Sequence, residues 1–335
     1  MYSLDIPQGY SSKMSLRDNE KAVKLIKDTF EDTLAAALNL DRVTAPLIVE
    51  AGNGVNDDLN GTERKVSFDI KQTGTEAEVV QSLAKWKRLA LARYGFQPSQ
   101  GLYTDMNAIR RDDDMDNLHS IFVDQWDWEK VITRGDRNCD YLKDTVKKIV
   151  DAVCDASEKV NAAFPENDVH LSRDVFFITS QQLEDMYPDD DPRTRENKIV
   201  REHKTVFIMQ IGGVLRSGKK HDGRAPDYDD WNLNGDIFFW HETLGCALEV
   251  SSMGIRVDET SIVSQLRACG NEDRMKFMYH ASVAQGILPL TIGGGIGQSR
   301  LCMLLLGKAH IGEVQVSVWP AEMLEKCAEH KIMIL

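Results

Sequence analysis

A glycine-rich segment followed by an apolar run constrains this chain more than any other part of its sequence. Positions 291–300 read TIGGGIGQSR, and positions 301–306 read LCMLLL. Because glycine has no Cβ atom, a flat or bulky ligand can lie directly on such a backbone. Arg300 begins the expected buried helix, where its planar guanidinium suits phosphate oxygens or an aromatic ring. The segment indicates a ligand site, with a plain glycine-rich turn ahead of a core helix as the alternative.

The glycine spacing excludes two common nucleotide motifs. No lysine follows the glycines, so the segment is not a phosphate loop of the GxxxxGK[ST] kind. The GxGxG spacing also departs from the GxGxxG fingerprint of dinucleotide-binding folds.

Length, composition and charge bound the class of protein. With 335 residues and 42% hydrophobic content, the chain can bury a large core. Since no proline- or serine-rich linker divides it, we expect one domain over residues 1–335. The net charge of −13 argues against broad binding to nucleic acid, which depends on lysine and arginine. A local basic site for ATP remains compatible with this charge.

The cysteines and the amino terminus favour a cytoplasmic protein. The six cysteines form no CxxC pair and no zinc-site spacing, and several stand in apolar runs. Residues 1–13 lack the apolar core of a signal peptide. No apolar run approaches the roughly 18 residues that span a bilayer. We therefore expect a reduced compartment and no membrane partner.

Hydrophobic periodicity predicts both helices and strands. The expected helices cover residues 15–38, 82–93, 139–164 and 192–202, with Ser15 or Asp18 as a cap of the first. The expected strands cover residues 43–49, 66–70, 78–81, 120–129, 175–179 and 206–211. Pro46 cannot donate a hydrogen bond within a central strand, so segment 43–49 belongs at a sheet edge or a subunit contact.

Three polar segments each allow a functional and a solvated interpretation. Loop 53–61, NGVNDDLNG, is rich in carboxylates and amides. Lys85, Lys87 and Arg88 stand near a helix start, where the dipole favours anions, so either an anionic partner compensates them or they form a solvated face. The acidic run 187–192, YPDDDP, is interpreted as a solvated loop because of its flanking prolines.

The strand at 120–129, SIFVDQWDWE, combines apolar and acidic residues. Alternation places Gln125, Asp127 and Glu129 on one face and Trp126 and Trp128 on the other. A bare carboxylate buried in such a strand would cost several kcal/mol, so each must be hydrogen-bonded or paired. Cations are available just upstream, at positions 110 and 111.

Residues 235–240 and 246–252 predict an antiparallel hairpin. With a loop at 241–244, Trp240 pairs with Gly245, and Asp236 lies opposite Glu249 with Cβ atoms about 5 Å apart. Such opposed like charges destabilise a sheet, and Mg²⁺ carried in with a nucleotide would remove the repulsion. The alternative is a register shifted by one residue, which sends the carboxylates to opposite faces.

With these residues in hand, the chain resembles the ammonia-dependent asparagine synthetases (aspartate–ammonia ligases), which are related to the catalytic domains of class II aminoacyl-tRNA synthetases. The matching stretches extend over nearly the whole chain, from about residue 46 to residue 319. They are SLAKWKR at 82–88, GLYT at 101–104, His119 with VDQWDWE at 123–129, RAPDYDDW at 224–231, LNGD at 233–236, SSMGIRVD at 251–258 and TIGGGIGQSR at 291–300.

The resemblance implies an α+β fold, with an antiparallel sheet flanked by helices, and a homodimer. Pro46 matches the motif 1 proline at a dimer interface, Arg110 the motif 2 arginine on the α-phosphate, and residues 293–300 motif 3. The loop after Trp231 departs from the expected pattern, because we expect bacterial relatives to carry a longer insertion there. A cover over the site from this loop is therefore in question.

The resemblance also implies a reaction, in which L-aspartate, ammonia and ATP give L-asparagine, AMP and pyrophosphate through β-aspartyl-AMP. The implied catalytic residues are Asp57, Arg110, Asp127 and Arg300, with Asp57 first and Asp127 second as the base for ammonia. The implied substrate contacts are Ser82, Lys87, Gln125, Asp127, Ser251, Ser252 and Gly293. The implied ATP contacts are Arg110, Ser120, Asp229, Arg256, Gly294, Gly295, Gly297 and Arg300. Asp236 and Glu249 would hold Mg²⁺.

Two rival functions use parts of the same pattern. One passes activated aspartate to tRNA, but the acidic charge and the lack of a recognisable anticodon-binding domain ahead of the core weigh against it. The other is a catalytically silent dimer that senses ATP or an amino acid. A binding module would not need Arg110, Asp236, Glu249 and Arg300 together.

Overall fold

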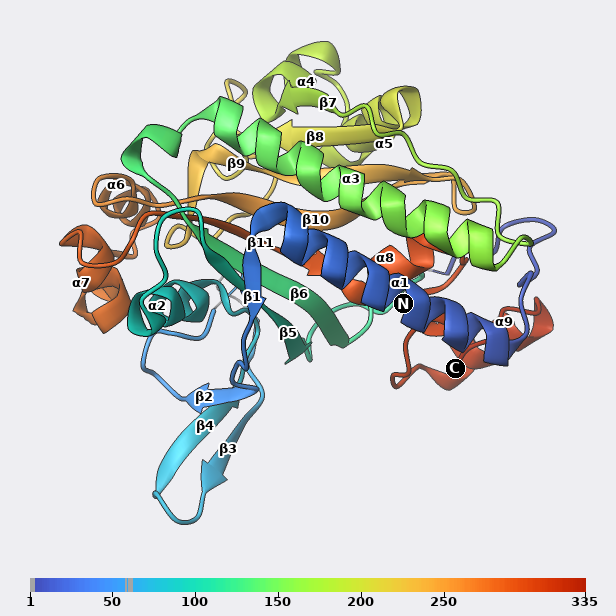
Figure 1. Cartoon of the computed structure of the whole chain (residues 1–335), viewed down its shortest axis with the longest axis horizontal. Helices are drawn as coiled ribbons and strands as arrows, with labels where there is room; N and C mark the ends of the chain where they lie inside the picture. Colours follow the sequence, from blue (N-terminus) through green and yellow to red (C-terminus); the bar gives the residue numbers. More distant parts are fainter. Residues whose placement is uncertain (1–3, 58, 60–62) are drawn as a thin grey trace.

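An eight-stranded sheet forms the centre of the molecule (Figure 1). The computed structural model describes residues 4–57, 59 and 63–335. Neighbouring strands are antiparallel except at the two edges, where β1 pairs with β5 and β7 pairs with β8 in parallel. In spatial order the strands are β1 (Leu40–Arg42), β5 (Gly101–Ile109), β6 (Phe122–Val131), β11 (Thr291–Gly297), β10 (Cys246–Arg256), β9 (Asp229–His241), β8 (Thr205–Met209) and β7 (Phe176–Thr179).

Two long helices and one short helix cover one face of this sheet. α1 (Leu16–Leu38) and α3 (Cys139–Ala163) lie side by side across it, and α8 (Gln298–Leu305) packs beneath them (Figure 1). Ser15 caps α1 by accepting a hydrogen bond from the backbone N–H of Asp18, which confirms Ser15 as the cap. Trp126 of β6 is fully buried against α1, with its ring 4.9 Å from that of Phe30.

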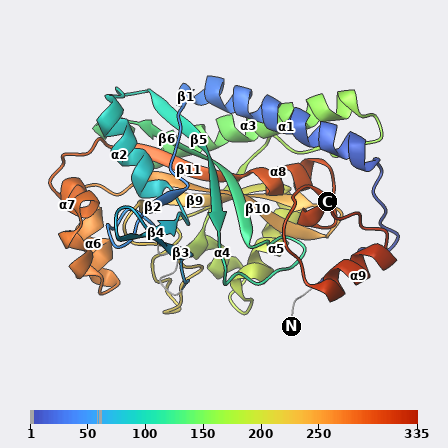
Figure 2. The same cartoon turned by 90° about the horizontal axis from the view of Figure 1, so that it is seen from below.

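Shorter helices surround the opposite face and the ends of the sheet (Figure 2). α5 packs on β8, β9 and β10, while α2 packs on β5, β6 and β11, so the centre of this face lies between them. The remaining elements are α2 (Ala84–Tyr94), α4 (Ser180–Met186), α5 (Pro192–His203), α6 (Ser261–Ala268), α7 (Met278–Ala284), α9 (Ala321–Glu329) and the 3₁₀ turns Arg134–Asp136, Glu272–Lys276 and Ile311–Glu313. Within the described ranges, no helix combines the length and apolarity needed to cross a bilayer.

The segment around Pro46 is not one strand, so the prediction of a strand at 43–49 was wrong. β1 ends at Arg42, and β2 (Ile48–Glu50) begins after the proline in a separate sheet. That sheet joins β2 to the hairpin of β3 (Ser67–Ile70) and β4 (Thr75–Val79), and it projects away from the main body (Figure 1). A proline lacks the N–H that a continuing strand requires, which fits the break at this point. The predicted pairing of two strands after residue 65 is confirmed, although the second begins earlier than expected.

The β9–β10 hairpin has a different register from the predicted one. Trp240 pairs with Ala247 because Gly245, with φ +61°, belongs to the turn. A bulge between Glu249 and Ser251 adds one more residue, so Asp236 faces Ser252 and Glu249 faces Phe238. The predicted direct opposition of Asp236 and Glu249 was therefore wrong. Both carboxylates still share one face, because Asp236 and Phe238 are two residues apart on β9.

Candidate active site

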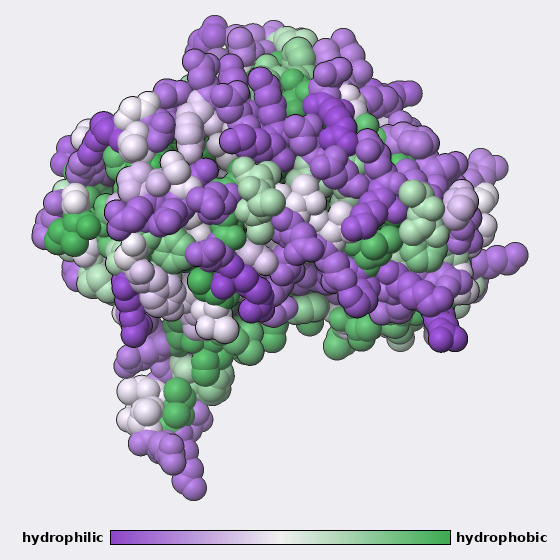
Figure 3. Space-filling model, viewed as in Figure 1, coloured by the Kyte–Doolittle hydropathy of each residue, from purple (hydrophilic) through white to green (hydrophobic). Residues whose placement is uncertain are grey.

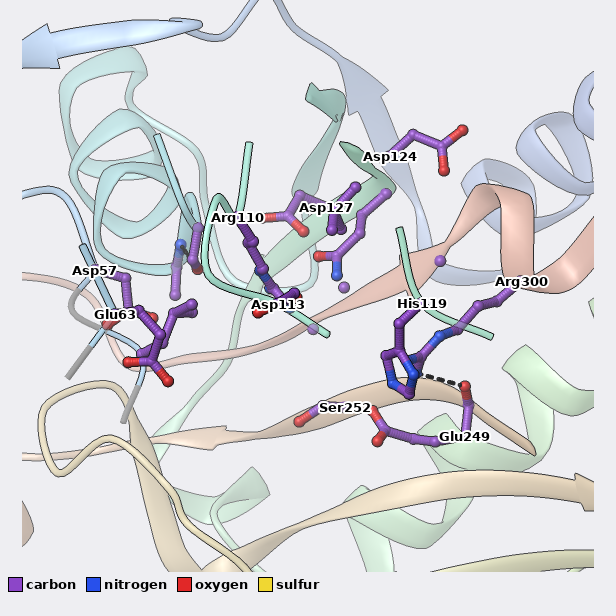
Figure 4. Close-up of a pocket in the computed structure, with 18 of the residues that line it drawn as sticks. Asp57, Glu63, Arg110, Asp113, His119, Asp124, Asp127, Glu249, Ser252 and Arg300 are labelled. Carbon is purple, nitrogen blue, oxygen red and sulfur yellow. Dashed lines mark hydrogen bonds between the residues drawn. The ribbon is translucent and has the colours of Figure 1, made fainter. Parts of the chain in front are cut away.

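A cavity of about 740 Å³ opens on the face of the sheet between α2 and α5. Its walls come from β6, β10, β11, the start of α8 and the segments that precede β6 and β9 (Figure 4). Fifteen of the residues predicted as site residues line it: Asp57, Ser82, Lys87, Arg110, Ser120, Gln125, Asp127, Asp229, Glu249, Ser252, Arg256, Gly294, Gly295, Gly297 and Arg300. The remaining three do not line it and are buried: Ser251, Gly293 and Asp236.

The basic residues of α2 are buried, so the interpretation as a solvated helix face was wrong. Lys87 Nζ lies 3.1 Å from Asp127 Oδ2 and donates a hydrogen bond to the carbonyl of Gly294 at 3.0 Å. Lys85 pairs with Asp227, and Arg88 donates to main-chain carbonyls. Burial lowers the pKa of Lys87, and Asp127 opposes this shift. Lys87 and Asp127 thus place one charge of each sign at the cavity wall.

A second charge cluster lies beneath the glycine strand. Arg256 donates to both oxygens of Glu129 and also pairs with Asp229. Burial alone would raise the pKa of Glu129, but Arg256 more than reverses this and the pKa is lowered. The buried carboxylates of β6 are paired as predicted, although their partners are Lys87 and Arg256 and not the cations just upstream of the strand. Since Asp229 and Glu129 already engage Arg256, a phosphate would have to compete for its N–H groups.

The glycines of β11 make room for side chains of β6. A Cβ atom on Gly293 would lie 2.2 Å from Glu129 Oε2, and one on Gly295 would lie 2.3 Å from Gln125 Oε1. The space over Gly293 and Gly295 is therefore occupied by protein, and the prediction that a ligand lies on the backbone there was wrong. Gly294, Gly295 and Gly297 still border the cavity.

Cations gather at the other end of the cavity. Arg110 comes from the segment after β5, and Arg300 from α8. Arg300 Nη1 donates to the carbonyl of Glu249 at 3.1 Å (Figure 4), and His119 lines the same cavity. Burial raises the pKa of Asp113, and Arg110, His119 and Arg300 oppose this rise, so all three side chains lie near Asp113. Arg110 and Arg300 thus line one cavity, as the assignment of both residues to ATP requires.

Asp57 is buried and borders the cavity near Tyr228. Burial raises the pKa of Tyr228, and Asp57 adds to this rise, which shows that the two side chains are close. Of the other carboxylate and amide residues of the predicted polar loop, Asn53 and Asn56 lie within the described residues, and Asn56 is buried. Asp58 and Asn60 lie outside the described residues, as does Gly61.

The predicted metal ligands do not form a cation site as they are arranged. Arg224 Nη2 donates to Asp236 Oδ1 at 2.5 Å and to Oδ2 at 2.6 Å, so the carboxylate is already paired. Of these two carboxylates, only Glu249 borders the cavity. Among the described residues, no group of three or more His, Cys, Asp or Glu side chains is placed to hold a metal ion. The acidic run at 187–192 forms no such site either, and Asp191 caps α5 by accepting from the N–H of Thr194.

Several residues of the cavity had no role in the sequence analysis. Arg224, His119 and Tyr228 lay within or beside matching stretches, but nothing in their spacing distinguished them from surface residues. The buried Asp227 was also missed. It joins Lys85, Arg274 and His280, which are 142, 47 and 53 positions away. Partners at such separations leave no local sequence signal.

The fold is that of class II aminoacyl-tRNA synthetase catalytic domains. The asparaginyl-tRNA synthetase of Entamoeba histolytica in complex with asparaginyl-adenylate matches with a TM-score of 0.65 and 14% identity, over 90% of this chain and 66% of that chain. The enzyme from Pyrococcus horikoshii complexed with asparaginyl-adenylate gives a TM-score of 0.64 at 15% identity, over 90% and 70%. At this identity the likeness concerns the fold.

The sequence relatives are more specific. A family model described as aspartate–ammonia ligase matches residues 17–331. The aspartate–ammonia ligase of Ligilactobacillus salivarius is 58% identical over 334 residues, which cover 99% of both chains. That of Ruminiclostridium cellulolyticum is 55% identical over 336 residues and the full length of both. This chain belongs to the aspartate–ammonia ligase family.

Proposed function

We propose that this chain joins ammonia to the β-carboxylate of L-aspartate at the expense of ATP, through a β-aspartyl-AMP intermediate. The products are L-asparagine, AMP and pyrophosphate. An AMP intermediate is needed because a carboxylate oxygen is a poor leaving group, whereas the phosphate of a mixed anhydride leaves readily. The whole of residues 1–335 acts as one catalytic domain in this proposal.

The first step transfers AMP to aspartate. A β-carboxylate oxygen attacks the α-phosphorus, and the bond between the α- and β-phosphates breaks to release pyrophosphate. Negative charge builds on the phosphate oxygens, and fixed cations that face them lower the barrier. Arg110 and Arg300 border the same cavity, which supports their role as these cations. His119, which lines the same cavity, is a further candidate for contact with the departing pyrophosphate.

The aspartate pocket needs groups of both signs, because the substrate carries two carboxylates and one ammonium. Lys87 and Asp127, 3.1 Å apart and both buried, supply such a pair. Gln125, Ser82 and Ser252 add hydrogen-bonding groups around them. We assign the α-ammonium to Asp127 and a substrate carboxylate to Lys87.

The second step is attack of ammonia on the activated carbonyl, with AMP as the leaving group. Ammonia is mostly NH₄⁺ at neutral pH, so a carboxylate must attract it and accept its proton. Asp57 is the first candidate because it borders the cavity and is not the partner of Lys87. Asp127 is the second, since it is already the partner of Lys87.

The observation that carries this proposal is the convergence of Arg110, Arg300, Lys87 and Asp127 on one cavity. The test is to incubate the protein with ATP, L-aspartate and ammonium and to measure AMP and asparagine in equal amounts. Release of AMP only when tRNA is present would favour transfer to tRNA. Binding of ATP with no product from any mixture would favour a sensor.

A homodimer through the segment around Pro46 is part of the proposal. Leu47, Ile48 and Phe68 expose 57%, 40% and 43% of their surface on the projecting sheet, where apolar atoms are prominent (Figure 3). Apolar side chains in such a position favour contact with a partner.

Mg²⁺ is proposed to accompany ATP as its counter-ion. A cytoplasmic location stays a prediction, with which the free thiols of all six cysteines are compatible.

A further inference from the structure

A buried asparagine joins the backbone of Asp57 to the end of β4. The side chain belongs to Asn56, which is 5% exposed. Its Oδ1 accepts from the backbone N–H of Asp57 at 3.0 Å and from that of Gln81 at 2.9 Å. Its Nδ2 donates to the carbonyl of Val79 at 3.1 Å and to Glu78 Oε2 at 3.0 Å. The amide thus makes four hydrogen bonds, as many as its two N–H groups and two lone pairs allow.

Asn56 supplies hydrogen bonds that the backbone of this loop lacks. Among the described residues, no backbone–backbone hydrogen bond is formed by residues 52–57. The oxygen of the other described asparagine, Asn53, accepts from the N–H of Val55, which is a contact within the loop itself. In the described part of the chain, the hydrogen bonds that fix the backbone of Asp57 relative to β4 are therefore those of Asn56.

The two N–H groups that Asn56 binds belong to two walls of the cavity. Asp57 borders the cavity, and Gln81 directly precedes Ser82, which borders it as well. One amide oxygen therefore sets the spacing between the backbone of the proposed base for ammonia and the backbone of a proposed aspartate contact. Asn56 itself does not line the cavity, so it can act on the reaction only through its neighbours.

We propose that Asn56 is a positioning residue for the ammonia step, and that it holds Asp57 at the distance from bound aspartate at which a carboxylate can take a proton from ammonium. The inference rests on the proposed function of Asp57. The nitrogen must lie about 3 Å from both the activated carbonyl carbon and the base, so a small shift of Asp57 has a large effect. Formation of β-aspartyl-AMP does not use ammonia, so it should be much less sensitive to Asn56.

The test compares two reactions of the full chain with Asn56→Ala, which removes all four hydrogen bonds and leaves Asp57 in place in the sequence. Asparagine formation should fall about 100-fold, the loss expected for a displacement by roughly 1 Å at a reacting site. Aspartate-dependent exchange of pyrophosphate with ATP should fall by no more than a few-fold, and the KM for ATP should not change. Thermal unfolding shows whether the variant is folded. Equal loss in both reactions would overturn the inference, because it would indicate general damage to the site.

A double variant tests whether Asn56 acts through Asp57. In an Asp57→Asn background, addition of Asn56→Ala should slow asparagine formation little further, because the base that it positions is already absent. A further loss as large as in the wild-type background would mean two independent effects and would contradict the inference.

The same measurements separate this inference from the proposed function. Absence of asparagine from the wild type would remove the proposed function itself. Equal loss of both reactions in Asp57→Asn would remove the role of Asp57 in the ammonia step, and with it the role of Asn56. Selective loss of asparagine formation in Asp57→Asn, combined with equal loss of both reactions in Asn56→Ala, would remove only the role of Asn56.

Asn53→Ala is the matched control, because Asn53 is an exposed asparagine of the same loop. It should leave both reactions unchanged, and a selective loss as large as that of Asn56→Ala would contradict the inference. If Asn56→Ala does not fold, Asn56→Asp replaces it, since this variant keeps the accepting oxygen but loses the donor and repels Glu78. It should show the same selective loss of asparagine formation. Failure of both variants to fold would show a structural role and contradict a positioning role.

Discussion

At the scale of single residues, the cavity depends on glycines of β11 whose lack of a Cβ atom leaves room for polar side chains of β6. A Cβ atom added at Gly295 would clash with the side-chain ends of Gln125 and Asp127, and both side chains can shift. We expect Gly295→Ala to fold with a melting temperature near that of the wild type. Activity should fall about 100-fold, because displacement by roughly 1 Å at a reacting site has this effect. Steady-state kinetics and thermal unfolding measure the two quantities.

Gly213→Ala is the control for this variant. No atom lies within 4 Å of the position of its new Cβ, and Gly213 is not in the left-handed region. It should retain both activity and stability. Loss of stability without selective loss of activity in Gly295→Ala would contradict the argument.

Asp57→Asn separates the two steps of the reaction. Aspartate-dependent exchange of pyrophosphate with ATP should continue, because this exchange does not need ammonia. Asparagine formation should slow by roughly 10²- to 10⁴-fold, as is typical for loss of a general base. Asp127→Asn is the comparison, and it should impair both measurements because Asp127 is the partner of Lys87, which we propose to bind aspartate. Equal loss of both in Asp57→Asn would remove Asp57 from the ammonia step.

The sequence predicted which residues form the site more accurately than it predicted their ion-pair partners. The alternation of the strand drew attention to Asp127 and Glu129, the family resemblance drew attention to Lys87 and Arg256, and the need to pair buried carboxylates was foreseen. The identity of each partner was not, because Glu129 and Arg256 are 127 positions apart and become neighbours only through the order of the strands.

At the scale of elements, Asp227 ties α2 to the segment before β9 and to α7. Burial alone would raise its pKa, but Lys85, His280 and Arg274 more than reverse this, and the pKa is lowered. A lowered folded-state pKa means that the carboxylate stabilises the fold above its unfolded pKa of about 4. This stability is lost as the pH falls from about 4 toward the lower folded-state pKa.

Asp227→Asn should therefore be less stable than the wild type at pH 7, and the difference should shrink as the pH falls below about 4. Urea unfolding at pH 7 and at lower pH values measures this. A loss of several kcal/mol is expected at pH 7, since removal of one partner leaves buried cations uncompensated. Asp185→Asn is the control, because Asp185 forms an exposed ion pair with Arg216. A difference between Asp227→Asn and the wild type that does not change with pH would contradict the charge argument.

Elements with a clear period were predicted well, and elements that depend on turns were not. α1 and α3 followed from their apolar spacing, and for α1 also from the polar cap Ser15. The helix α4 was missed because it spans only seven residues, although Thr179 and Gln182 form a capping box at its start. The hairpin register depended on the left-handed Gly245 and on a bulge, which the alternation of residues does not reveal.

At the scale of the whole molecule, the projecting sheet of β2, β3 and β4 is the proposed dimer contact. Phe68→Glu should weaken a dimer, because it places a charge where an apolar side chain would be buried. Sedimentation at several protein concentrations should show a shift toward the monomer. Met278→Glu is the control, since Met278 is 60% exposed on a different part of the surface, on α7. A wild type that is monomeric at all concentrations would exclude the homodimer.

The strand β6 has a practical consequence for anyone who seeks a heat-tolerant version of this enzyme. Trp126 and Trp128 support the packed layer under α1, while Gln125 and Asp127, on alternate positions, face the substrate cavity. A bulkier residue introduced beneath the strand would shift the strand as a unit. Redesign for robustness should therefore begin at the outer helices α5 and α9 and leave the tryptophan layer untouched.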